Sequence, residues 1–293
     1  MNAQSGREAT LQLQDGRKFA YTEHGDLRGK PILFIHGNPG SRYVRHPDET
    51  IAQKLGARVI TPDRPGYGLS DFQAKRRLLD YADDIVQLMD SLGIEKFAVL
   101  GVSAGGPYAA VSAYKLPQRI TRTAIVSSAA PIDRENPYEN LHPSVRVAFQ
   151  MVKNLPGWLC HLILWQQTRK QQAQPEKSLA ERAAILSPSD QNLLARPEIK
   201  AQVLGYRKEA VRQGVKGTLR EIQILASPWG FRLEDIRGEV HIWHWEADLL
   251  VPIQMGRYLA QHIPDAHLHF LPGGGHYSIF ECWQEILESL LST

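Results

Sequence analysis

A serine in a glycine-rich turn is the feature that most restricts how this chain can fold. The hexapeptide GVSAGG at residues 101–106 follows an apolar run typical of a buried strand and precedes a helix-compatible segment that begins with proline. So sharp a turn forces Ser103 into a sparsely populated backbone conformation, and only small neighbours let strand and helix close around it. The sequence predicts a strand, this serine and a helix in succession, with the hydroxyl exposed at the helix N-terminus. A plain glycine-rich turn is the alternative.

Strand-like and helix-like segments alternate along the chain. Apolar residues at three- and four-residue intervals over 78–92 predict an amphipathic helix, and another is expected around 280–291. Because strands that alternate with helices form parallel sheets, the expected fold class is α/β: a mostly parallel eight-stranded sheet flanked by helices, with a helical cap insertion. The segments predicted to be strands are 11–13, 18–23, 31–35, 58–61, 97–100, 123–127, 239–245 and 266–271.

The stretch 131–226 differs from both of its flanks. It shows no strand-like alternation, is divided by seven prolines, and carries 14 Lys and Arg against 9 Asp and Glu. A helical insertion between late strands indicates a lid, so we expect a core domain of residues 1–130 and 227–293 and a cap domain of residues 131–226. The positive balance suggests either tolerance for an anionic substrate or a solvated face. Apolar side chains in this stretch or just after it that either line an acyl pocket or simply pack on the core are Phe149, Met151, Trp158, Leu159, Leu162, Trp165 and Trp229.

Composition limits the classes to which this chain can belong. With 293 residues, 43% hydrophobic and 22% charged, it can bury a core without disulfides, and Cys160 and Cys282 lie in no redox or zinc motif. A net charge of +3 with scattered basic residues argues against nucleic acid as a partner, and no apolar run is long enough to span a membrane. We therefore expect a cytoplasmic protein that acts on a small molecule, with no cofactor and no metal.

His276 is the candidate general base. A serine hydroxyl is a weak nucleophile and needs a base, an acid that orients the base, and donors for an oxyanion. Of eleven histidines, only His276 follows three glycines, at the end of a predicted strand, so its loop can reach back across the sheet edge. His267 and His269 are expected on one face of that strand. Together with His241 and His244 they leave metal ligation as an alternative, although no zinc-enzyme spacing is present.

Asp248 is the candidate acid. It follows the predicted strand at 239–245, so its carboxylate is expected at the same sheet edge as the serine. A turn or N-cap role is the alternative for this aspartate. Glu246, in the same turn, and Asp133, after the preceding strand, are the competing acids.

Two backbone amides are the candidate oxyanion donors. One belongs to Ala104, the residue after the nucleophile, and the other to the loop HGNPG at 36–40, where Asn38 is placed to turn its amide toward Ser103. A neutral turn is the alternative for this loop. Asp63, in the motif DRPGYGLS, also ends a strand, but the prolines and glycines around it predict that it hydrogen-bonds its own turn.

These motifs, taken in order, resemble the α/β-hydrolase superfamily. They are HGNPG, DRPGYGLS, GVSAGG, ADLLVP and GGGH, they cover residues 10–130 and 230–293, and the order serine, aspartate, histidine is that fold's own. The resemblance implies a set of catalytic groups: Ser103 as nucleophile, His276 as base, Asp248 as the orienting acid, and the backbone amides of Asn38 and Ala104 as oxyanion donors. It also implies that the stretch 131–226 is the cap that many members insert after the sixth strand.

The chain departs from the superfamily's patterns at three places. Members usually carry glycine where Trp245 stands, so the turn before Asp248 is expected to have an altered shape. HGNP is similar to the loop of haloalkane dehalogenases, but those enzymes, like the epoxide hydrolases of this fold, use an aspartate where Ser103 stands. The loop at 61–70 lacks the DQRG sequence of proline iminopeptidases.

The expected function is hydrolysis of a carboxylic ester through an acyl-enzyme on Ser103. The substrate is expected to be a small molecule with an apolar acyl or alcohol part. Two alternatives use the same triad. One is a ligand-sensing protein with slow turnover, and the other is a cofactor-free perhydrolase or haloperoxidase.

Overall fold

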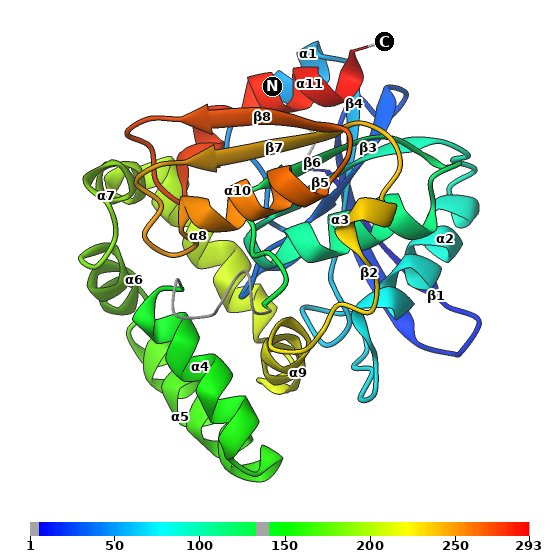
Figure 1. The fold of residues 1–293 in the computed structure, drawn as a ribbon. Coiled ribbons are helices and arrows are strands. Elements are labelled where there is room, and N and C mark those ends of the chain that lie inside the picture. Colours follow the sequence, from blue (N-terminus) through cyan, green and yellow to red (C-terminus); the bar gives the residue numbers. More distant parts are fainter. Residues whose placement is uncertain (1–5, 133–140, 293) are drawn as a thin grey trace.

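One continuous sheet of eight strands forms in the part of the chain that the computed structural model describes, residues 6–132 and 141–292. The strands are β1 (Arg7–Gln12), β2 (Lys18–Gly25), β3 (Lys30–Ile35), β4 (Ala57–Pro62), β5 (Phe97–Val102), β6 (Ile120–Val126), β7 (Val240–Trp245) and β8 (Ala266–Leu271). Their order across the sheet is β1-β2-β4-β3-β5-β6-β7-β8 (Figure 1). β2 runs antiparallel to both of its neighbours and every other pair is parallel, so the predicted α/β class with a mostly parallel sheet is confirmed.

The predicted strands differ from the observed ones only at their ends. β1 begins at Arg7 rather than at residue 11, because this edge strand is largely exposed and has no apolar alternation to mark it. β5 continues to Val102, whose backbone pairs with Val126 of β6. The strand therefore ends directly before Ser103 and delivers it to the edge of the sheet where the parallel strands end.

Helices cover both faces of the sheet. On one face lie α2 (Tyr81–Ser91), α3 (Gly106–Lys115) and α10 (Ile253–His262), and on the other α1 (Thr50–Lys54) and α11 (Trp283–Leu291). Short 3-10 turns are η1 (Leu78–Asp80), η2 (Ser103–Gly105), η4 (Leu233–Asp235) and η5 (Ser278–Phe280). The amphipathic helix predicted at 78–92 is confirmed as η1 followed by α2, and its apolar side is buried in the core.

Six helices lie between β6 and β7 in the described residues. They are α4 (Pro143–Asn154), α5 (Gly157–Ala173), α6 (Pro175–Ala183), α7 (Pro188–Ala195), α8 (Pro197–Ala210) and α9 (Lys216–Leu225), called here the helical insertion. Four of them begin at a proline, whose fixed φ suits the first turn and whose missing N–H is not needed there. In Figure 1 α7 and α8 lie beyond the ends of β7 and β8. The helical insertion thus stands over the sheet edge that carries Ser103.

Buried ion pairs fix the helical insertion to the core. Glu221 of α9 accepts hydrogen bonds from Arg64 at 2.5 Å and from Arg76 at 2.9 Å, and none of these side chains is more than 1% exposed. Glu209 of α8 likewise accepts from Arg42 at 2.7 Å. Removing one partner of a buried pair leaves an uncompensated charge, so these contacts resist separation of the two parts.

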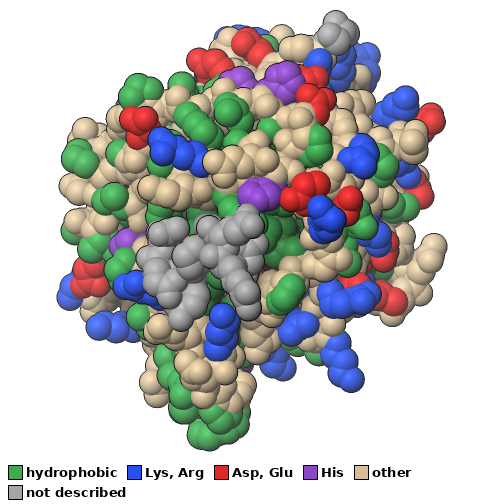
Figure 2. Space-filling model, in the orientation of Figure 1, with side chains coloured by type: hydrophobic (Ala, Val, Ile, Leu, Met, Phe, Trp, Pro, Cys, Tyr) green, Lys and Arg blue, Asp and Glu red, His purple; other side chains and the backbone are tan. Residues whose placement is uncertain are grey.

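The α4–α5 hairpin presents apolar side chains to solvent. Figure 2 shows hydrophobic side chains gathered at the lower end of the molecule, where this hairpin lies in Figure 1. The exposed residues are Val147, Leu155, Trp158, Leu162 and Trp165. Among the described residues, no helix combines the length and apolarity that crossing a membrane would need.

Candidate active site

Ser103 occupies the tight turn between β5 and α3. Its φ of 55° lies in the left-handed region, which residues other than glycine seldom adopt. The turn is so compact that a Cβ built on Gly105 would come within 2.1 Å of the carbonyl oxygen of Ile35 in β3. The predicted succession of strand, serine and helix is confirmed, with Ser103 half-buried at the helix N-terminus.

The carboxylate of Asp248 is hydrogen-bonded to His276. Nδ1 of His276 lies 2.8 Å from Oδ2 of Asp248, and because a carboxylate only accepts, Nδ1 carries the proton and Nε2 is an acceptor. Oδ1 of Asp248 accepts from the backbone N–H groups of Leu250 and Val251, each at 2.9 Å. Burial alone would raise the pKa of Asp248, but the charge and hydrogen bond of His276 outweigh burial and lower it. The acid is therefore ionised at neutral pH.

The competing acids are placed differently. The side chain of Glu246 is exposed, and Asp133 lies outside the described residues. Trp245, which stands where glycine was expected, does not separate Asp248 from the histidine. Its indole lies beside Gly274, where a Cβ would come within 2.1 Å of Cδ1 of the ring. The indole of Trp245, which stands where superfamily members usually carry glycine, thus has room because Gly274 of the His276 loop has no side chain.

The HGNPG loop lies beside Ser103. A Cβ built on Gly37 would be 3.1 Å from the Cβ of Ser103, so any side chain at position 37 would crowd the serine. The carbonyl oxygen of Gly37 accepts a hydrogen bond from Arg64 at 2.8 Å. The side-chain oxygen of Asn38 accepts from the hydroxyl of Tyr67 at 3.0 Å, which holds the loop against the core. The backbone amides of this loop and of the serine turn stay predicted oxyanion donors.

The DRPGYGLS turn supports the HGNPG loop. The backbone N–H of Arg64 donates to Nε2 of His36 at 3.1 Å, so Nδ1 carries the proton and donates to the Gly37 carbonyl at 2.8 Å. Burial, followed by the charge of Arg64, lowers the pKa of His36 well below its ordinary value, and the ring is neutral. Asp63 accepts from the N–H of Leu69 at 2.9 Å, which confirms the prediction that it binds its own turn.

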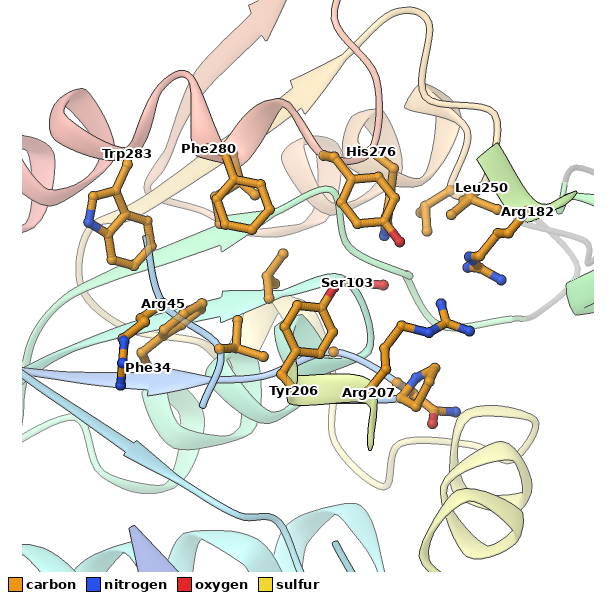
Figure 3. Close-up of a pocket in the computed structure, with 18 of the residues that line it drawn as sticks. Phe34, Arg45, Ser103, Arg182, Tyr206, Arg207, Leu250, His276, Phe280 and Trp283 are labelled. Atoms are coloured by element: carbon orange, nitrogen blue, oxygen red, sulfur yellow. The ribbon is translucent and has the colours of Figure 1, made fainter. Parts of the chain in front are cut away.

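Ser103 and His276 line one cavity of about 140 Å³ between the sheet and the helical insertion. An engineered cavity of about 150 Å³ binds benzene, so this space suits a compact group. Figure 3 shows that the cavity has two unlike sides, with Ser103 and His276 between them. Phe34, Phe280 and Trp283, with Arg45 beside them, form the mainly apolar side, and Arg182 of α6 and Arg207 of α8 form the charged side opposite.

Of the two roles left open for the seven apolar side chains named from the sequence, lining this cavity is not observed for any of them. α4 and α5 pack on α9 and on each other, and α4 contributes Val145 to the lining of the cavity. The three aromatic side chains on its mainly apolar side come from the core. Arg182 and Arg207 were missed, because only the packing of α6 beside α8 brings them together and no sequence spacing marks it. Nε of Arg182 is buried and has no hydrogen-bond partner among the described residues.

The histidines of β7 and β8 form a separate stacked group. The ring of His241 stacks on His267 and on His269, which confirms that the latter two share one face of β8. His244 is buried elsewhere and donates from Nε2 to the carbonyl of Val251 at 2.7 Å. No group of three or more His, Cys, Asp or Glu in residues 6–132 and 141–292 is arranged to hold a metal ion.

This chain matches a known protein family and is similar to known proteins in sequence and in fold. Residues 30–281 match the family model described as alpha/beta hydrolase fold. The chain is 25% identical over 267 residues, 87% of its length, to the 2-hydroxy-6-oxo-6-phenylhexa-2,4-dienoate hydrolase of Burkholderia cepacia, of which 84% is covered. It is similar to the structure of an esterase (EaEST) from Exiguobacterium antarcticum, with a TM-score of 0.74 and 19% identity over 98% of this chain and 100% of that one. The bromoperoxidase from Bacillus anthracis gives a TM-score of 0.70 and 22% identity over 98% and 99%. Structural likeness at these identities shows the fold alone.

Proposed function

Because this chain belongs to the α/β-hydrolase fold family and is a hydrolase, we propose that it cleaves carboxylic esters through an acyl-enzyme on Ser103. One observation carries the proposal. The bond of 2.8 Å from Nδ1 of His276 to Asp248 leaves Nε2 as a proton acceptor in the cavity that also holds the strained Ser103. A nucleophile, a base and an ionised acid that orients the base are the groups that acyl transfer needs.

The proposed reaction begins when Oγ of Ser103 attacks the ester carbonyl and its proton moves to Nε2 of His276. The oxyanion forms beside the loop that contains Gly37, where the amides of Asn38 and Ala104 donate to it. His276 returns the proton to the leaving alcohol as the carbon–oxygen bond breaks. Water, deprotonated by the same imidazole, then releases the acid. Asp248 keeps the imidazole in one tautomer and stabilises its charged form throughout.

The two sides of the cavity suggest which substrates fit. Aromatic rings on one side suit a compact apolar group, and two arginines on the other suit a carboxylate. We propose that the substrate joins an apolar part to an anionic one, with the scissile carbonyl between them at Ser103. In this arrangement the helical insertion, with residues 131–226 as its proposed limits, acts as a cap that supplies the anion-binding side.

A second candidate function is hydrolysis of a carbon–carbon bond next to a ketone. The arginine pair favours it, since the substrate in the name of the Burkholderia relative is a dienoate with an oxo group and no ester. Cleavage of that bond creates a carbanion that must gain a proton, whereas cleavage of an ester releases an alkoxide. The two functions therefore differ in the leaving group and not in the carbonyl that is attacked.

A fluorophosphonate probe and an ester panel test the proposal together. The probe should label the parent protein and the Ser227→Ala control, whose exposed serine lies outside the cavity, and should leave Ser103→Ala unlabelled. The parent should hydrolyse p-nitrophenyl esters, while Ser103→Ala should lose about 10⁴-fold or more of kcat. Ester hydrolysis by Ser103→Ala at the parent rate would refute the proposal. Labelling of Ser103 with turnover of an oxo-dienoate and none of esters would favour the second candidate.

A further inference from the structure

The helical insertion reaches the loop of His276 through one buried carboxylate. Asp190, in the first turn of α7, accepts hydrogen bonds from the backbone N–H of His276 at 3.0 Å and from that of Tyr277 at 2.7 Å. Asp190 is 0% exposed. The two segments fit closely, since a Cβ built on Gly275 would come within 2.2 Å of both the Asp190 carboxylate and the Ser187 hydroxyl. α7 therefore packs directly on the backbone that carries the proposed base.

A carboxylate suits this position better than an amide. The Asp190 oxygens face three donors, namely two backbone amides and the hydroxyl of Ser187. Burial raises the pKa of Asp190, while the Tyr277 amide and the charge of His276 oppose that rise. An asparagine would offer one oxygen and turn its NH₂ group toward an N–H.

We infer that Asp190 is a positioning residue that fixes the imidazole of His276 relative to Ser103 by holding two consecutive amides of its loop. The inference rests on the proposed role of His276 as base. Tyr206 of α8 and Tyr277 of the loop line the same cavity, so a second helix of the insertion lies close to this loop. When α7 is displaced, the loop is released. The position of the helical insertion therefore sets the distance and orientation of the His276 imidazole relative to Ser103.

Asp190→Asn tests the inference, because it keeps the side-chain shape and removes the charge and one acceptor. We expect kcat for a p-nitrophenyl ester to fall about 10²-fold with little change in KM. The amides of His276 and Tyr277 should exchange faster with deuterium. Arg196→Ala is the matched control. It removes an ion pair with Glu281 at the same junction, in which both side chains are more than 40% exposed, and should leave all three measurements unchanged.

A second variant keeps the inference testable if Asp190→Asn does not fold. Gly275→Ala pushes the loop away from α7 while Asp190 stays intact, and it should also lower kcat and speed exchange of the two amides. Folded Asp190→Asn with the parent kcat would overturn the inference, and so would parent-like amide exchange. If Asp190→Asn does not fold, parent-like kcat and exchange in Gly275→Ala would overturn it. If the parent shows no Ser103-dependent hydrolysis, only the proposed function is refuted. Amide exchange still shows whether Asp190 holds the loop.

Discussion

The carboxylate of Glu221 in α9 accepts a hydrogen bond of 2.5 Å from the guanidinium of Arg64, and both side chains are 0% exposed. Another nitrogen of the same guanidinium donates to the carbonyl of Gly37 at 2.8 Å, directly beside Ser103. One arginine therefore joins the helical insertion to the loop of the proposed oxyanion donors. Changes at this pair should affect both stability and turnover.

Glu221→Gln should destabilise the protein strongly. It leaves Arg64 and Arg76 buried without a counter-charge, and breaking a buried pair in this way costs about 3–5 kcal/mol. Urea unfolding followed by tryptophan fluorescence measures the change. Glu176→Gln is the control, since it disrupts an exposed pair with Lys200 and should leave the unfolding free energy nearly unchanged. Equal losses in the two variants would contradict the role given to the buried pair.

The same glutamate should make stability depend on acid pH. Burial would raise the pKa of Glu221, but the charges of Arg64 and Arg76 outweigh burial and lower it below its ordinary value of 4.5. Its contribution is therefore complete above the ordinary value and is lost as the pH falls through the lowered one. Unfolding free energies of the parent should fall more steeply below pH 5 than those of Glu221→Gln, by up to about 1.4 kcal/mol per pH unit. Parallel curves would disprove this assignment.

Asp248→Asn should cost turnover more than substrate binding. The amide can accept from Nδ1 of His276 only weakly and stabilises neither the tautomer nor the charged imidazole, so kcat should fall by about 10³–10⁴-fold. Glu246→Gln, with an exposed side chain in the same turn, should keep the parent kcat. Stopped-flow measurement of the acylation burst separates a loss of turnover from a loss of substrate binding. If Glu246→Gln lost as much kcat as Asp248→Asn, the assignment of Asp248 as the acid would be wrong.

Arg182→Ala and Arg207→Ala should lower activity toward anionic substrates selectively. Each removes a charge-assisted contact worth about 1.5–3 kcal/mol, which corresponds to a loss of roughly 10- to 150-fold in kcat/KM for a succinate hemiester. The methyl ester of the same substrate should be hydrolysed by the variants at nearly the parent rate. Arg169→Ala is the control, because Arg169 lies in α5 outside the cavity. Equal losses for charged and neutral substrates would argue against an anion-binding side.

Short acyl groups should be preferred over long ones. The cavity has a volume of about 140 Å³, and Phe34, Phe280 and Trp283 border it on the mainly apolar side, so we expect little room for a chain much longer than a benzene-sized group. In a p-nitrophenyl ester series, kcat/KM should peak at about C2–C4 and fall steeply by C8. Phe280→Ala should move the optimum toward longer chains. A flat profile across the series would contradict this limit on chain length.

Much of the fold and the proposed triad follows from short motifs. The turn at Ser103 needs only a strand, small residues and a helix, which are contiguous in sequence. Asp248 and His276 could be paired in advance, because parallel neighbouring strands end at the same edge of a sheet. Even the unexpected Trp245 left this relationship intact, since its indole found room beside a glycine of the next loop.

The contributions of the helical insertion could not be predicted in the same way. Arg182, Arg207 and Asp190 act on the cavity or its loop only because α6, α7 and α8 pack together, and that packing has no periodic signature. The presence of an aspartate at position 190 can also be explained by α7 alone, because a negative charge in the first turn of a helix interacts favourably with the helix dipole. Ser187 caps the same helix, so nothing in the segment requires a distant partner.

The buried pairs at Glu209 and Glu221 also bear on how this enzyme can diversify. A cap from another relative, grafted between β6 and β7, would have to bring carboxylates to the same two places or leave Arg42, Arg64 and Arg76 with fewer counter-charges. Under the proposed function, point changes along α6 and α8 would alter substrate preference without disturbing these pairs, whereas exchange of the whole segment would disturb them. The helical insertion is thus coupled to the core that carries it and is not an interchangeable module.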